Sequence, residues 1–80
     1  MTSGKSITEL TTLALEALRK QPNCTEIRSV SLYGLPDVQD GRNWEISYVD
    51  SSRTWIGDIE RGVITVHYQL SRLYHWIPDD

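Results

Sequence analysis

The chain has 80 residues, of which 39% are hydrophobic and 24% charged, and its formal net charge at pH 7 is −3. This length suits one domain with a single small core. The negative charge gives no general attraction to nucleic-acid phosphates or anionic membranes, and the Lys and Arg residues are scattered rather than clustered. Cys24 is the only cysteine, which excludes an intramolecular disulfide and an all-cysteine metal site.

The first residues of the sequence show no pattern of a targeting signal. It lacks the apolar core of a secretion signal, and no apolar run approaches the roughly 20 residues that cross a bilayer. We therefore expect a cytoplasmic protein with no membrane partner. Residues 1–5 are small and polar, and we expect them to be disordered.

The first helix is predicted over residues 6–20. Ser6 and Glu9 have the spacing of a capping box, in which each residue satisfies the backbone amide of the other. Pro22 cannot continue the helix, which should end near residues 20–21. Its apolar face follows helical spacing and comprises Ile7, Leu10, Ala14, Ala17 and Leu18.

Two strands should follow, over residues 27–33 and 44–49, because apolar and polar residues alternate there. The second strand has one heavily apolar face, made by Trp44, Ile46 and Tyr48. Residues 34–41 are rich in turn formers and too numerous for a tight hairpin. We expect a mobile loop there, joining an antiparallel pair.

The last helix is predicted over residues 59–77, with Asp58 as its N-cap and Pro78 beyond its end. At about 100° per residue its apolar side chains cover a sector of roughly 120°. They are Ile59, Val63, Val66, Leu70, Leu73, Tyr74 and Ile77. Residues 64–70 also alternate as in a strand, but the helical pattern is much longer. Residues 53–56 either form a short third strand or lead directly into this helix.

These elements predict an α+β fold of order α-β-β-(β)-α, with two helices packed on one face of a small antiparallel sheet. We expect a single domain over residues 6–78 and an acidic tail at residues 79–80. Two strands alone are marginally stable in water. Either the helices supply most of the core, or two copies join their sheets or helices in a homodimer.

No group of residues in the sequence supports catalysis, a cofactor site or a metal site. His67 and His75 would stand about 12 Å apart along the predicted helix, too far to bind one metal ion together. Cys24 has no neighbouring base and no motif that would lower its pKa. We therefore expect no enzyme activity, no cofactor and no metal.

The last helix has more apolar side chains than its core stripe needs. Aromatic and aliphatic residues beside an Arg and a His are typical of a protein interface. The candidate interface comprises Trp55, Ile56, Ile64, Tyr68, Arg72, His75 and Trp76. Alternatively, some of these residues cover the sheet edge or fold under the tail, and the sequence leaves both possibilities open.

Motifs along most of the chain resemble a group of short uncharacterised bacterial proteins. These motifs are Ser6-Ile-Thr-Glu-Leu, Ala14-Leu-Glu-Ala-Leu-Arg-Lys, Pro22-Asn-Cys24, Asn43-Trp-Glu-Ile-Ser and Gln69-Leu-Ser-Arg-Leu-Tyr74. The resemblance implies a final helix over the last strand. It implies no activity, ligand or site residue.

The predicted element order is also similar to that of the double-stranded-RNA-binding domain. That family grips phosphates with a lysine cluster at the start of its last helix, where this chain has Asp58-Ile-Glu-Arg61. We interpret this as shared architecture without shared function. The sequence predicts a small interaction or regulatory module that binds a protein partner or a second copy of itself. A nucleic-acid-binding domain is the alternative.

Overall fold

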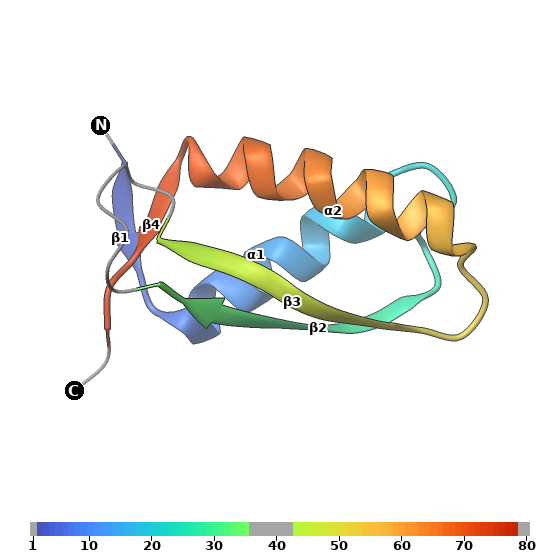
Figure 1. Cartoon of the computed structure of the whole chain (residues 1–80), viewed down its shortest axis with the longest axis horizontal. Coiled ribbons are helices and arrows are strands. Elements are labelled where there is room, and N and C mark those ends of the chain that lie inside the picture. The colour runs from blue at the N-terminus through green and yellow to red at the C-terminus, as the bar shows by residue number, and fades with distance from the viewer. Residues whose placement is uncertain (1, 36–42, 79–80) are drawn as a thin grey trace.

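The computed structural model describes residues 2–35 and 43–78, which form elements in the order β-α-β-β-α-β (Figure 1). They are β1 (Ser3–Lys5), α1 (Ile7–Arg19), β2 (Ile27–Gly34), β3 (Trp44–Ser51), α2 (Ile56–Ser71) and β4 (Tyr74–Trp76). The expected class, a small α+β fold with two helices and an antiparallel strand pair, is confirmed. The predicted loop mobility at residues 36–41 and the predicted acidic tail lie outside the described residues.

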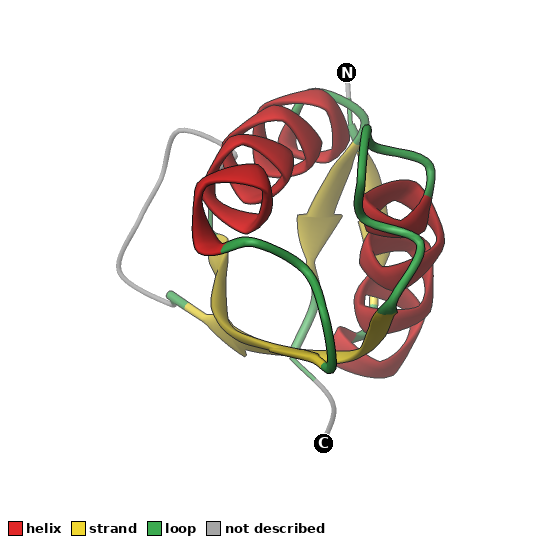
Figure 2. Cartoon of the chain, turned by 90° about the vertical axis from the view of Figure 1, so that its right-hand side faces the viewer, coloured by secondary structure: helices red, strands yellow, loops and turns green. Residues whose placement is uncertain are grey.

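Both helices lie on the same side of the sheet formed by β2 and β3 (Figure 2). These strands pair antiparallel from Ile27↔Ser51 to Gly34↔Trp44. Helix α1 packs mainly on β2, while α2 runs beside β3 (Figure 1). The buried apolar residues between the layers are Leu10, Ala14, Leu18, Cys24, Ile27, Val30, Trp44, Val66 and Leu70.

Helix α1 begins where its capping residue predicts. The backbone amide of Glu9 donates to Ser6 Oγ at 3.2 Å, although the Glu9 carboxylate accepts from the Ser6 hydroxyl at 3.3 Å rather than from the Ser6 amide. At the other end, Arg19 Nε donates to the Ile27 carbonyl at 2.9 Å. This hydrogen bond ties the end of α1 to the first residue of β2.

An extra residue in β3 changes which side chains face the helices. Ile46 and Tyr48 pair with consecutive residues of β2, so Ser47 is inserted in the ladder as a bulge. A bulge shifts the inward and outward alternation by one residue. Tyr48 is therefore 64% exposed, whereas Val49 packs against the core. The prediction that Tyr48 shares the apolar face of Trp44 is wrong.

Helix α2 is shifted towards the N-terminus relative to the prediction. It begins at Ile56, so residues 53–56 do not form a third strand, and it ends at Ser71. Leu73 and Ile77 fit the helical spacing but are 56% and 48% exposed. The prediction of a helix to residue 77 is wrong because residues 74–76 are extended and form β4, whose backbone partners lie in β1.

Strand β4 pairs in parallel with β1, so the expectation of disorder is wrong for residues 3–5. The pairing is extended at both ends, where the Ser3 amide donates to the Leu73 carbonyl and the Ile77 amide donates to the Lys5 carbonyl, each at 2.9 Å. A Cβ on Gly4 would overlap the outer carbons of the Ile77 side chain, so Ile77 would have to move to accept a larger residue there. The pairing of β1 with β4 joins the two ends of the described chain. No local pattern in the sequence predicts this pairing.

Asn43 and Trp44 attach β4 to the beginning of β3. Asn43 Nδ2 donates to the Trp76 carbonyl at 2.7 Å, and its Oδ1 accepts from the Trp76 amide at 2.8 Å. The side-chain amide thus makes the pair of hydrogen bonds that a neighbouring strand would make. Trp44 Nε1 donates to the Tyr74 carbonyl at 3.3 Å. These side chains hold β4 in place although β3 and β4 belong to separate sheets.

Alanine substitutions at Gly34 and Gly57 should distinguish a fixed tryptophan from a movable one. A Cβ on Gly34 would overlap the ring of Trp76, which is half-buried and whose backbone is hydrogen-bonded to Asn43. A Cβ on Gly57 would overlap the ring of Trp55, which is 64% exposed. Gly34→Ala should lower the free energy of unfolding by about 1–3 kcal/mol because Trp76 cannot move aside. Gly57→Ala should leave it unchanged or raise it by up to ~1 kcal/mol, since alanine favours the helix.

Urea denaturation of the two variants measures this difference. Equal destabilisation by both substitutions would contradict a fixed position for Trp76.

Candidate functional site

The candidate interface residues at the start and middle of α2 are exposed, which is one of the two possibilities that the sequence leaves open. The exposed fractions are 64% for Trp55, 65% for Ile56, 70% for Ile64 and 52% for Tyr68. Arg72 is also exposed, and its guanidinium carbon lies 5.6 Å from the centre of the Tyr68 ring. These residues present apolar surface to solvent along α2.

His75 and Trp76 do not belong to that surface. Both are half-buried in β4, because α2 ends before it reaches them. His75 Nδ1 lies 2.8 Å from Thr2 Oγ1, and Trp76 packs against the core. Their predicted place beside Ile64 and Tyr68 on one helical face is therefore wrong.

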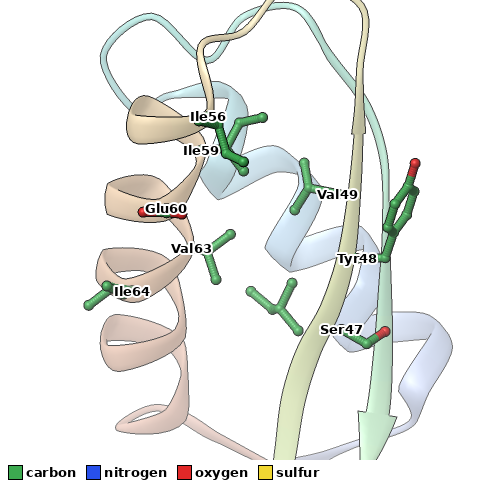
Figure 3. Close-up of a pocket in the computed structure, with 9 residues that line it drawn as sticks. Ser47, Tyr48, Val49, Ile56, Ile59, Glu60, Val63 and Ile64 are labelled. Atoms are coloured by element: carbon green, nitrogen blue, oxygen red, sulfur yellow. The ribbon is translucent and has the colours of Figure 1, made fainter.

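A groove lies between α2 and β3, with a volume of about 450 Å³ (Figure 3). Its lining residues come from β3 and α2, and they are Ile46, Ser47, Tyr48, Val49, Ile56, Ile59, Glu60, Val63 and Ile64. In Figure 3, Val49 and Val63 point into the space between strand and helix, while Tyr48 and Ile64 point away from it on the outer sides. The groove is thus mainly aliphatic.

A smaller hollow of about 170 Å³ follows the groove towards the start of β3. It is lined by Glu45, Ile46, Val63 and His67, so it shares Ile46 and Val63 with the larger groove. The two hollows therefore form one path along β3.

The edge of β3 that faces this path has no strand partner among the described residues, because β3 pairs only with β2 on its other side. The orientation of the edge follows from His67, whose Nε2 donates to the Trp44 carbonyl at 2.8 Å. The Trp44 carbonyl accepts this hydrogen bond from a residue of α2. It therefore points away from β2, which pairs with the other edge of β3. Backbone groups alternate in direction along a strand, so β3 beyond Trp44 also presents amides and carbonyls on this side.

The charged groups that line the path are carboxylates. Glu60 lines the groove from α2, Glu45 lines the smaller hollow from β3, and no Lys or Arg of residues 2–35 and 43–78 lines either. Tyr33 donates its hydroxyl to Glu45 Oε2 at 2.9 Å. This hydrogen bond and the charge of Glu45 raise the pKa of Tyr33 above its ordinary value. The groove thus has the charge of Glu60 in its lining, and the charge of Glu45 lies beside Tyr33 on the outer face of the sheet.

The sequence missed this groove, and its candidate interface includes only Ile56 and Ile64 among the lining residues. Ile59 and Val63 were assigned to the core stripe of the helix, and both are only half-buried because they face the groove. Helical spacing identifies the face that a helix turns inward. It carries no information on how closely that face approaches the strand opposite.

The residues that the sequence excluded from chemistry lie apart in the structure. His67 is on α2 and His75 on β4. Among residues 2–35 and 43–78, no group of three or more His, Cys, Asp and Glu could hold a metal ion. Within the same ranges, neither helix is long and apolar enough to cross a membrane.

Cys24 is fully buried, and its thiol donates to the Asp58 carbonyl at 3.6 Å. Burial and, to a smaller extent, the negative charge of Asp58 raise the pKa of the thiol. A raised pKa leaves less of the reactive thiolate at a given pH. Cys24 is thus part of the core rather than a nucleophile.

Alkylation of Cys24 by iodoacetamide should be at least about tenfold slower in the folded protein than in urea at about pH 8, because access and thiolate formation are both reduced. Mass spectrometry of timed samples measures the rate. Similar rates with and without urea would show that the thiol is accessible and would contradict its buried position.

Comparisons with known proteins indicate no family for this chain. No protein-family model, no curated protein and no solved structure matches it. Any function must therefore be argued from the groove, the strand edge and the charges beside them.

Proposed function

We propose that the protein is a protein-interaction module that binds an extended segment of a partner polypeptide between α2 and β3. One observation carries the proposal, namely that an unpaired strand edge and an aliphatic groove lie side by side. In this mode of recognition the segment adds a strand to the sheet. Backbone hydrogen bonds supply affinity, and alternate side chains enter the groove.

The dimensions of the groove support a short strand as its occupant. Residues 46–49 line it from β3, which corresponds to about 13 Å of extended chain. The groove is open rather than enclosed, whereas sites for small molecules usually enclose most of the ligand surface. A peptide that is covered on one side only suits this shape better than a small ligand.

Charge favours a partner over a second copy of the chain. Antiparallel pairing of β3 with β3 of another copy about a twofold axis would bring Glu45 and Glu60 of both chains into one interface. Each chain already carries a net charge of −3. Like charges beside paired strands are destabilising.

The nucleic-acid-binding alternative has less support. Its basis was the predicted element order with a possible third strand, and the described residues instead have strands at both ends and none at residues 53–56. A cytoplasmic location and a relationship to short bacterial proteins remain predictions from the sequence.

Substitution of Ile59 by tryptophan should block the groove. Ile59 is a half-buried residue of α2 that lines it, whereas Ser29 is an exposed residue of β2 that does not. Peptides selected from a random display library on the unmodified protein should bind Ile59→Trp at least about tenfold more weakly, because an indole would occupy their place. They should bind Ser29→Trp with unchanged affinity.

Titration of the ¹⁵N-labelled protein with a selected peptide should shift amides at residues 46–49 and 56–64. The proposal fails if no peptide is selected, or if selected peptides bind Ile59→Trp as tightly as the unmodified protein. Light scattering after size exclusion should show a monomer. A dimer that Ile59→Trp dissociates would make a second copy the occupant and would also overturn the proposal.

A further inference from the structure

We infer that the segment bound in the α2–β3 groove is basic, with Lys or Arg residues between alternating aliphatic residues. This inference rests on the proposed function and adds to it the chemical class of the partner. It is carried by the two glutamates along the path and by the positions of the arginines on α2.

Two glutamates would flank a strand added to β3. Glu60 lines the groove from α2. Glu45 lines the adjoining hollow as a residue of β3, and its carboxylate accepts from the Tyr33 hydroxyl on the outer face of the sheet. Both glutamates are exposed. A segment that pairs with β3 therefore meets Glu60 on the helix side and Glu45 on the outer face.

The arginines of α2 and its C-cap are directed elsewhere. Arg61 lines a separate hollow with Gln21 and Pro22, at the turn that follows α1. Arg72 lies over the ring of Tyr68 near the end of α2. Neither arginine lines the groove, so an incoming segment must supply the positive charge that would pair with Glu45 and Glu60.

The outer face of β3 adds a second reason for cations. Glu45 and Tyr48 are both exposed on this strand, with Tyr48 placed outward by the bulge at Ser47. Side chains of an added strand that do not enter the groove would lie beside these two residues. A Lys or Arg there would pair with the carboxylate across the strands or lie over the phenol ring.

The aliphatic component follows from the groove itself. Val49 of the strand points towards Val63 of the helix, and Ile46 and Ile59 also line the groove. Successive side chains of a strand point to opposite faces, so every second residue of the segment would enter this space. The expected sequence pattern therefore alternates aliphatic and basic residues.

Three synthetic peptides of about nine residues test the inference. They share aliphatic residues at alternate positions and carry Lys, Gln or Glu at the positions between. Fluorescence anisotropy at about 0.01 M ionic strength should show the Lys peptide binding about tenfold more tightly than the Gln peptide, and the Glu peptide most weakly. The preference should shrink as salt is added.

Charge reversal distinguishes local from general attraction. The double variant Glu45→Lys/Glu60→Lys should invert the order of the three peptides. The control Glu16→Lys/Glu26→Lys changes the net charge equally at exposed carboxylates that do not line the path, and it should retain the preference for Lys. An inversion in the control as well would overturn the inference, because net charge alone would explain it.

The remaining outcomes separate the inference from the proposed function. If all three peptides bind equally and shift the amides of residues 46–49, the basic class is wrong and the proposed function stands. If none binds, and display selection also yields no groove-dependent peptide, both fail. If the Lys peptide binds but shifts amides away from β3 and α2, the groove is not its site and the inference is overturned.

Discussion

The buried indole of Trp44 is the contact on which the arrangement of the other elements depends. Its Nε1 donates to the Tyr74 carbonyl, its ring meets that of His67 edge to face at 4.9 Å between centroids, and its own carbonyl accepts from His67. A buried indole N–H needs such a partner. One residue at the start of β3 therefore positions both α2 and β4.

The same anchorage explains why the groove opens where it does. Helix α2 is held to β3 near His67, and its buried residues Val66 and Leu70 lie on that half of the helix. Towards its beginning, Ile59 and Val63 are only half-buried, and no strand of residues 2–35 and 43–78 covers the β3 edge. An uncovered edge promotes association between strands, and charged neighbours such as Glu45 and Glu60 limit its pairing with other acidic chains.

Short-range patterns predicted the elements whose ends are set by neighbouring residues. The Ser6 cap and Pro22 bound α1 correctly, and alternation identified β2 and β3. Helical spacing also placed Ile64 outside the core stripe, and it is exposed. The position of Tyr48 did not, because the bulge at Ser47 depends on how β3 is registered against β2 and breaks the period of two.

By itself the sequence determined an α+β chain with one strongly capped helix, an apolar strand and a surplus of apolar residues on the second helix. Only the tertiary structure decided that residues 74–76 leave that helix, since their partners, β1 and Asn43, are remote in sequence. It also decided that an aliphatic groove remains beside an unpaired edge. Periodicity describes one element at a time, whereas a groove depends on the distance between two.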